Sequence, residues 1–264
     1  MTEGLFTPAL SLRLWCRSLL LQACWNFERM QNIGLAYGLE PWLGLVYPDP
    51  AARRAALLRH ADFFNTNPYM EPMIVGMLCA LEEEAAALDG LAREQKYARL
   101  SALKKALASA LAGIGDALFW QTLRPFCAAA ALLAGFWLWR LGAGWAVSAM
   151  ALLYLAVYNI PAVSLRWKGL RWGYDWREQI AARLQGFAWQ AWISRLRLAG
   201  TAVSVLLIAS LLAAAGGRAQ KMLAVLAFLA GPIADRLYPR AVSAVAVYMG
   251  AGVLGTLAAA AGWI

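Results

Sequence analysis

Histidine is almost absent from this sequence, since His60 is the single one among 264 residues. There is no HExxH motif and no cluster of metal-ligand residues, so the sequence gives little support to a metal centre or a Ser-His-Asp mechanism. The cysteines have no CxxC spacing and lie in apolar contexts, which is typical of small buried side chains: Cys16, Cys24, Cys79 and Cys127. We therefore expect no cofactor and no metal, and a membrane-embedded enzyme is the least supported class of function.

Charged residues are also scarce. They make up 15% of the chain, whereas 62% is hydrophobic; soluble domains have roughly 25% and 45–50%. Three uncharged stretches, at 141–165, 198–217 and 241–264, approach or exceed the roughly 20 residues that span a bilayer. The net charge of +9 comes from short basic runs between apolar segments, which is typical of cytoplasmic loops beside lipid. The sequence thus predicts a multi-pass membrane protein in contact with lipid and with no nucleic-acid partner.

Three further features refine this prediction. The first residues lack the basic segment and apolar core of a cleavable signal peptide, so we expect insertion through the internal spans. A shorter uncharged run at 125–139 ends at Arg140, whose long side chain can reach the membrane interface. The run at 222–234 is too short to span, so we expect a half helix or a re-entrant segment there.

Two polar breaks, at 62–68 and 112–116, interrupt apolar surroundings. Polar backbone at membrane depth is costly unless it lines a cavity or is buried in protein, so each break predicts a re-entrant hairpin. We expect helices at 10–31, 51–64 and 68–88 and one from about 101 that is interrupted at 113–116, turns at 40–41 and 47–50, and a polar region at 158–175 between spans. The predicted fold is an all-α integral membrane protein with about four to five transmembrane helices plus re-entrant helical hairpins. We expect a single domain over 1–264, with an amphipathic, re-entrant half at 1–120 and a transmembrane half at 121–264.

Four blocks of sequence identify a family. They lie at 26–31 with Gly34, at 59–68, at 80–83 after Gly76 and at 111–120, and a weaker block lies at 158–161 with 173–174. Together and in this order, they resemble the IID membrane component of the mannose/fructose/sorbose family of the bacterial phosphotransferase system (PTS). Two positions depart from the family pattern: Ser109-Ala110 stands where Gly-Pro is usual, and Asn67 stands where His or Gln is frequent. The resemblance therefore leaves the sugar open.

The resemblance implies a subunit of a larger transporter. In this family IID pairs with the IIC membrane subunit to translocate a sugar, here a hexose or amino sugar, while the soluble IIA and IIB components carry the phosphoryl group. IID itself is not expected to carry that group. The implied location is the bacterial cytoplasmic (inner) membrane, in a hetero-oligomer. The alternative is a non-transporting scaffold that docks PTS components.

The first break supplies the candidate substrate-binding residues. Asn65, Thr66 and Asn67 can hydrogen-bond sugar hydroxyls, because amides both donate and accept. The alternative is a helix start at Pro68 that is capped by Asn67. Asp116 is a candidate for the same site, or else the N-cap of a helix at 117–122.

Other motif residues have structural interpretations. Gly113 and Gly115 are expected to allow a tight turn. Glu82 and Glu83, with Glu84, are expected to form a solvated helix end or to pair with Arg93 and Lys96 rather than to act as general bases. Glu28 and Arg29 are expected to form a structural or intersubunit ion pair. His60 is expected to be a structural histidine at the sheltered end of a helix rather than a phosphoryl acceptor.

Overall fold

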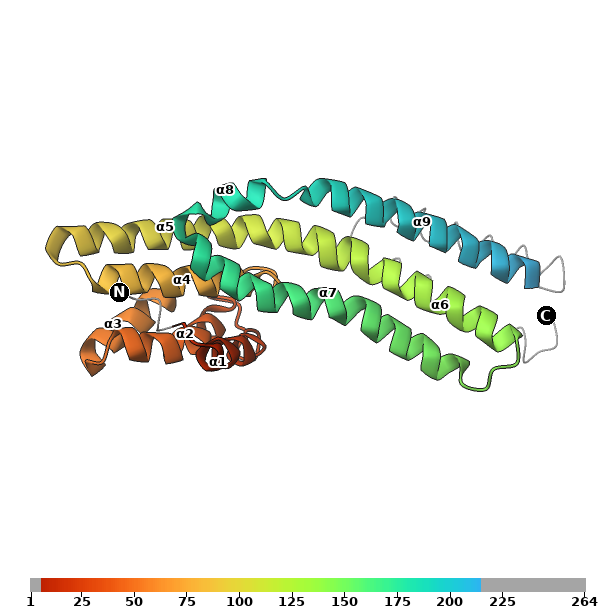
Figure 1. Cartoon of the computed structure of the whole chain (residues 1–264), viewed down its shortest axis with the longest axis horizontal. Coiled ribbons are helices and arrows are strands. Elements are labelled where there is room, and N and C mark those ends of the chain that lie inside the picture. The colour runs from red at the N-terminus through yellow and green to blue at the C-terminus, as the bar shows by residue number, and fades with distance from the viewer. Residues whose placement is uncertain (1–5, 215–264) are drawn as a thin grey trace. The chain divides into compact units, whose positions relative to one another are not determined.

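The computed structural model describes residues 6–214, and the regular elements of that range are all helices. In chain order they are α1 (Pro8–Ser18), α2 (Asn32–Val46), α3 (Pro50–His60), α4 (Glu71–Ala86), α5 (Gly90–Gly115), the π-helix η1 (Asp116–Leu123), α6 (Arg124–Arg140), α7 (Ala146–Trp176), the short 3-10 helix η2 (Arg177–Gln179), α8 (Ile180–Gln185) and α9 (Trp189–Ala214). Figure 1 labels the α-helices. The predicted all-α class is confirmed.

Local signals set two of the helix starts. The Thr7 hydroxyl accepts a hydrogen bond of 3.3 Å from the Leu10 amide, and Pro8 occupies the first helical position of α1. Asp49 does the same for α3, where its carboxylate accepts from the Ala52 amide at 2.8 Å and Pro50 follows. Both starts combine an N-cap side chain with a proline whose missing N–H would have had no helical partner.

Helix α4 is the centre of the core. Its residues are buried without interruption from Glu71 to Glu82, and it contacts α7, α5 and α2. Its backbone passes close to that of α7, because a Cβ at Gly76 would collide with the Leu170 carbonyl and one at Gly173 with the Met73 carbonyl. A helix that is buried on every side depends on its neighbours for stability.

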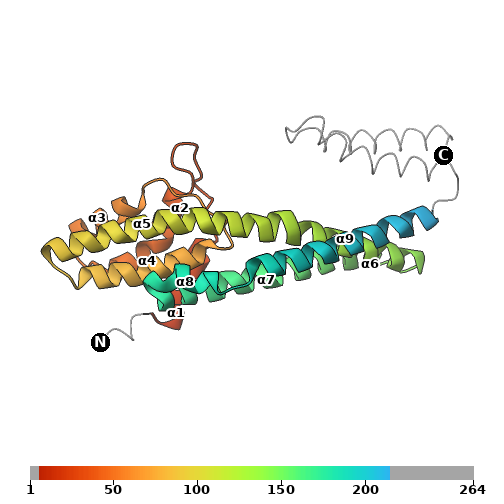
Figure 2. The ribbon, with the colours of Figure 1, turned by 90° about the horizontal axis from the view of Figure 1, so that it is seen from above.

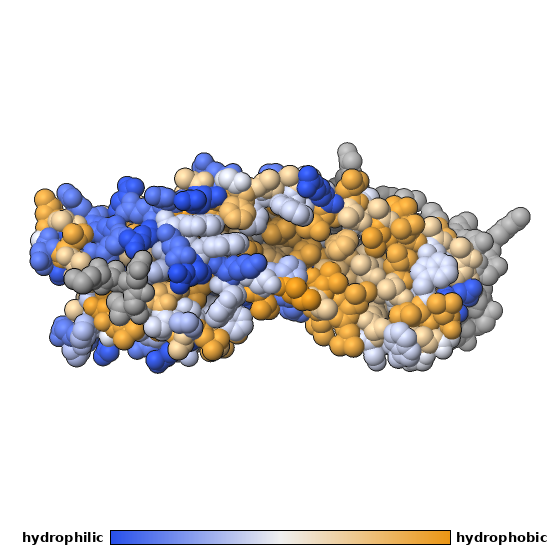
Figure 3. Space-filling model, in the orientation of Figure 1, coloured by the Kyte–Doolittle hydropathy of each residue, from blue (hydrophilic) through white to orange (hydrophobic). Residues whose placement is uncertain are grey.

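Three helical stretches of the described range are long and apolar enough to cross a membrane. They are Gly90–Arg140, Ala146–Gln185 and Trp189–Ala214. On the face shown in Figure 3, hydrophilic residues gather over the part that holds α2 to α4, and hydrophobic residues gather over the α6–α7 hairpin. The further segments expected at 222–234 and 241–264 lie outside the described residues.

The N-terminal helix is shorter than predicted, and one expected turn is absent. The helix expected over 10–31 ends at Ser18, after which turns lead to Asn26. The turn expected at 40–41 lies inside α2, which continues through Pro41. Proline cannot donate to the carbonyl four residues earlier. In α2 this carbonyl is that of Tyr37, and the Arg17 side chain donates to it at 2.9 Å, so it still has a hydrogen-bond partner.

Two expected interruptions are also helical. The chain does not break at 113–116: α5 runs into η1 and then α6. The polar region expected at 158–175 lies within α7, which continues through Pro161. Its Arg166 is buried and donates to the Ser18 carbonyl at 2.8 Å, so this polarity marks contact with α1 rather than a loop.

The chain divides into two units, Met1–Thr201 and Ala202–Ile264. Within the first unit, α5, η1 and α6 pass through the expected division at residue 120 without a turn. Figure 2 shows this continuous helix beside α4. The single-domain organisation stays a prediction.

Candidate functional site

The segment between α3 and α4 is fixed by a side chain from the end of the α1–α2 connection. Gln31 is buried, and its amide oxygen accepts from the Thr66 amide at 2.9 Å. Its amide nitrogen donates to the Thr66 carbonyl at 3.0 Å. This pair of bonds satisfies the backbone of a non-helical residue, as burial requires.

Asn67 and Asp116, both predicted site residues, meet directly although 49 residues separate them. The Asn67 amide nitrogen donates to a carboxylate oxygen of Asp116 at 2.9 Å, and the Asn67 amide oxygen accepts from the Tyr69 amide at 3.0 Å. Asn67 is only 1% exposed, whereas Asp116 is exposed. The site therefore has a buried amide at its base and a carboxylate at its edge.

The glycines and Asp116 do not play the backbone roles predicted for them. Gly115 has an ordinary helical backbone, and Asp116 begins a π-helix with no side-chain cap bond. The predicted N-cap role of Asp116 and the tight turn at these glycines are therefore wrong. Gly115 is small for a different reason, because a Cβ there would overlap the side chain of Asn67. Gly113 is exposed and has open space around it.

The helix start predicted at Pro68 is also displaced. Residues 68–70 form a turn, and α4 begins at Glu71 with Pro72 in its first turn. The Asn67 carbonyl accepts from the amides of Met70 and Glu71, both at 3.0 Å. Asn67 thus organises the approach to α4 without being its N-cap.

Asn65 has a different environment from Asn67. It is exposed and lines a cavity of about 450 Å³ together with Phe63, Phe64, Lys105, Ala108, Ser109 and Ala112. The neighbouring Thr66 hydroxyl is buried and finds no hydrogen-bond partner among the described residues. Asn65 and Asn67 therefore face different surroundings.

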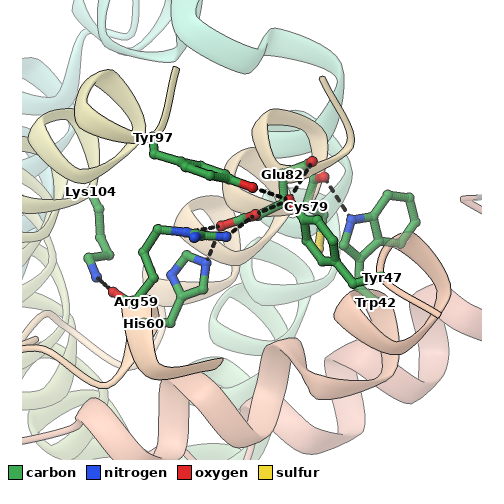
Figure 4. Close-up of polar contacts among 8 residues, drawn as sticks. All are labelled: Trp42, Tyr47, Arg59, His60, Cys79, Glu82, Tyr97 and Lys104. Carbon is green, nitrogen blue, oxygen red and sulfur yellow. Dashed lines mark hydrogen bonds and ion pairs between the residues drawn. The ribbon is translucent and has the colours of Figure 1, made fainter. Parts of the chain in front are cut away.

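A second polar cluster lies at the other end of α4, around Glu82 (Figure 4). One carboxylate oxygen of Glu82 bonds Arg59 Nε at 3.0 Å and His60 Nε2 at 2.8 Å. The other bonds the second Arg59 nitrogen at 2.8 Å and the Tyr47 hydroxyl at 2.7 Å. Tyr97 approaches Tyr47 to 3.1 Å and lies under the Arg59 guanidinium. This Glu82 hub joins the C-terminal end of α2 to α3, α4 and α5.

The pKa values in the Glu82 hub follow from burial and pairing. Burial favours the neutral carboxyl, but hydrogen bonds from His60 and Arg59 outweigh it and lower the pKa of Glu82 to about 2. Burial lowers the pKa of His60, and it raises the pKa of Tyr47 with help from the Glu82 charge. Glu82 is therefore ionised at neutral pH. Arg59 supplies the fixed positive charge.

The hub corrects the interpretation of the acidic run. Glu82 is fully buried, so the expected solvated helix end is wrong for it. Glu83 accepts from the Tyr174 hydroxyl at 2.7 Å. Glu84 pairs with Lys96, as predicted, but Arg93 pairs with Asp89 instead, at 2.9 Å. Among the described residues, no group of His, Cys, Asp and Glu could hold a metal ion.

Comparison with known proteins identifies the family. A family model described as "PTS system mannose/fructose/sorbose family IID component" matches residues 7–249. The chain belongs to this family. The IID chain is 36% identical over 178 residues to the mannose-specific EIID component of Escherichia coli strain K12, and 35% identical over 179 residues to the fructose permease IID component of Bacillus subtilis strain 168. Each match covers 66% of this chain and 58% of the relative.

Solved structures extend the likeness over almost the whole chain. One is described as a cryoEM structure of the mannose transporter ManYZ in complex with microcin E492; it is 26% identical, with a TM-score of 0.55. Another, described only as a membrane protein, is 27% identical, with a TM-score of 0.67. Both likenesses cover 97% of each chain. IID proteins are membrane proteins, which agrees with the three helical stretches long enough to span.

Three of the four sequence blocks that resemble the IID family, the first, second and fourth, meet at one place in the fold. Gln31, from the first block, holds Thr66, from the second. Asn67, also from the second, bonds Asp116 from the fourth. Glu28 and Arg29 of the first block lie 3.4 Å apart and are exposed, away from this junction.

Four further residues lie beside the Asn67–Asp116 pair, and the sequence did not indicate that they would lie there. Tyr158 donates to the Tyr69 hydroxyl at 3.0 Å, and the Arg166 guanidinium lies 5.7 Å from the Tyr69 ring. Glu71 is fully buried, and both its carboxylate oxygens lack hydrogen-bond partners among the described residues. Burial raises the pKa of Glu71 to about 8, although the Arg166 charge opposes this. A glutamate just after the break, in an otherwise apolar run, was the signal for it.

Proposed function

We propose that this chain is the IID membrane subunit of a mannose-family PTS transporter in the inner membrane of a bacterium. It works with a IIC subunit to translocate a hexose or amino sugar, which a IIB component phosphorylates. The soluble IIA component supplies the phosphoryl group to IIB. The family membership supports this role, and the matched relatives are named as components of such systems.

The convergence of the family blocks is the observation that carries the proposal. Gln31, Thr66, Asn67 and Asp116 come from three separate segments, yet they form one connected polar site. It lies where the buried α4 approaches the continuous helix that extends into the apolar α6. Ligand sites are typically apolar surroundings with a few convergent polar groups.

Each of the predicted site residues can contact a sugar through hydrogen-bonding groups that have no partner within the described residues. Asp116 retains a carboxylate oxygen outside its bond to Asn67, and the Asn65 side chain faces a cavity. The Thr66 hydroxyl has both its donor and its acceptor capacity free among the described residues. Asn67 has a second amide N–H, which can donate to a sugar hydroxyl while the first one holds Asp116 in place.

The geometry of His60 supports the absence of phosphoryl transfer on this subunit. Its ring is fully buried, and one ring nitrogen is bonded to Glu82. A phosphoryl donor would have to displace Arg59 and open the junction of α3 and α4 to reach it. The phosphorylation step accordingly belongs to the soluble components.

A swap of the paired groups tests the site. Asn67→Asp places two carboxylates at hydrogen-bond distance and should disrupt the junction by repulsion. Asp116→Asn alone removes the charge. The double variant Asn67→Asp/Asp116→Asn restores one amide–carboxylate bond in the opposite sense. We expect it to restore membrane abundance and assembly with IIC but not sugar uptake, because each group now presents the wrong chemistry to the sugar.

Uptake is measured in cells that supply the cognate IIC, IIA and IIB, and it is normalised to membrane abundance. Full recovery of both abundance and uptake in the double variant would show that the pair is only structural. Uptake that does not need the chain at all, while the chain still binds the other components, would instead indicate the docking role.

A further inference from the structure

A small hairpin projects from the connection between α1 and α2. The Asn26 and Met30 backbones exchange two hydrogen bonds, of 3.1 and 2.9 Å. The Asn26 side chain accepts from the Arg29 amide at 2.7 Å. Met30 has a positive φ of 58°, a strained conformation for a residue with a side chain. Such strain persists only where the surrounding structure fixes it.

The base of the hairpin is tied to the segment before the candidate site. The Arg29 carbonyl accepts from the Phe64 amide at 3.3 Å, and the Gln31 amide donates to the Phe64 carbonyl at 2.8 Å. Asn26 donates to the Asn32 side chain at 3.1 Å, and Asn32 donates to the Ala61 carbonyl at 2.8 Å. The hairpin is thus a rigid extension of the site rather than a loose loop.

The tip of this rigid hairpin is apolar and uncovered. Phe27 is 88% exposed, and Trp25 is 42% exposed with its ring centroid 4.7 Å from that of Phe27 in an edge-on arrangement. Leu19 and Leu20, just before it, are about half exposed. A fixed backbone that presents bare aromatic rings has no benefit for the stability of this chain alone, because exposed rings gain nothing from burial.

Charges on the same tip distinguish a protein partner from lipid. Glu28 has a side chain that is 81% exposed, and its neighbour Arg29 is 53% exposed. A carboxylate beside the most exposed ring would resist insertion into hydrocarbon. Aromatic residues with an arginine are instead the composition of protein interfaces, where rigid aromatic anchors fill pockets and charged groups lie at the rim.

We propose that the hairpin at 26–30 is an anchor for the second membrane subunit of the transporter, the IIC protein. This inference rests on the proposed function. The partner surface that fits it is an apolar pocket deep enough for the Phe27 ring, with Trp25 against one wall. At its rim lie a hydrogen-bond acceptor for Arg29 and a donor for Glu28. The hairpin is bonded to Phe64 and leads directly into Gln31, which bonds Thr66. The contact with IIC would therefore be connected to the backbone of the candidate site.

Spin labelling at the tip tests the contact in the assembled complex. The burial expected for the cysteines holds for Cys79 and Cys127 but is wrong for Cys16 and Cys24, which are exposed. Phe27→Cys is therefore labelled with a nitroxide in a chain in which Cys16 and Cys24 are serine, and the complex with IIC is reconstituted in lipid nanodiscs. We expect low collision rates with both oxygen and a water-soluble nickel chelate. The control label is Leu91→Cys, on a residue that is 70% exposed at the start of α5. It should collide freely with the nickel chelate.

Each other result overturns the proposal. High oxygen access with low nickel access would place the tip in lipid, and high nickel access would place it in water. If the complex forms and supports uptake but the tip is accessible, the hairpin proposal fails and the transporter role stands. If the chain does not assemble with IIC, the proposed function itself fails.

Truncation of the ring gives a second measurement. Phe27→Ala should weaken the affinity for IIC by tenfold or more, as expected for an interface hot spot. The same truncation at another exposed apolar position, Leu58→Ala in α3, should leave the affinity unchanged. Unchanged thermal unfolding of the isolated Phe27→Ala chain would show that the loss is not misfolding. Equal affinities for Phe27→Ala and wild type would contradict the proposal.

Discussion

Replacement of Glu71 by glutamine should stabilise this protein at neutral pH. The carboxyl is fully buried, neither of its oxygens has a hydrogen-bond partner among the described residues, and its pKa is raised from 4.5 to about 8. The folded chain therefore keeps a proton at neutral pH that the unfolded chain releases. The stability that this carboxyl contributes is fully present below about pH 4.5 and is lost as the pH rises toward 8.

The size of the effect follows from that difference. One pKa unit corresponds to about 1.4 kcal/mol. At about pH 7.5, the need to keep the Glu71 carboxyl protonated therefore lowers the free energy of unfolding by up to about 4 kcal/mol. Glutamine has nearly the same shape and carries no proton to retain. Glu71→Gln should therefore raise the melting temperature by several degrees at about pH 7.5 and have little effect at about pH 4.5.

The assay is thermal unfolding of the purified complex across this pH range, with tryptophan fluorescence as the signal. Glu94→Gln, at an exposed position of α5, is the matched control and should change nothing. A melting temperature that is lower for Glu71→Gln than for the wild type at neutral pH would contradict this expectation. That result would mean that Glu71 is ionised in the folded chain and stabilised by the nearby Arg166 charge.

Three other substitutions probe the core. Glu82→Ala should destabilise the fold by roughly 3–5 kcal/mol, because it leaves the Arg59 charge without its buried partner. In the wild type, the lowered pKa of Glu82 stabilises the fold by about 3 kcal/mol above about pH 4.5, and this stabilisation should be lost as the pH falls to about 2. The loss should be seen as acid unfolding, and Glu82→Gln should lack this pH dependence. Gly173→Ala should lower the yield of folded protein sharply in a size-exclusion assay, since its Cβ would collide with the α4 backbone, whereas Gly113→Ala should be tolerated. Arg17→Leu should destabilise by about 1–3 kcal/mol, because it leaves the Tyr37 carbonyl without its donor; equal melting curves for Arg17→Leu and wild type would contradict this account of the Pro41 helix.

Hydropathy predicted the fold class because a bilayer places one strong requirement on a chain. The uncharged run at 141–165 contains the whole first half of α7, and the run from 198 became most of α9. Polarity was a poorer guide to the breaks. The two glycines beside an aspartate at 112–116 looked like a loop, but the helix simply widened into a π-helix, where side-chain positions shift and functional residues often gather.

The candidate site was partly visible in the sequence. Asn67 and Asp116 both stood out as polar residues in apolar surroundings, and the fold brings them together. Gln31 did not stand out, because a single polar residue at the end of a polar connection carries no local signal. Its role depends on a contact with Thr66, 35 residues away. The buried state of Glu82 was hidden for the same reason, since its partners come from the end of α2 and from α3, more than 20 residues away.

The burial of α4 on every side has a consequence for synthesis. The backbone of α4 packs closely against Gly173, which lies in α7. Gly173 is synthesised about 90 residues after the end of α4. At the usual pace of translation this delay is roughly 5–20 s. During that time the apolar helix has no α7 to cover it. The packing of α4 can therefore be completed only after most of the protein has been made.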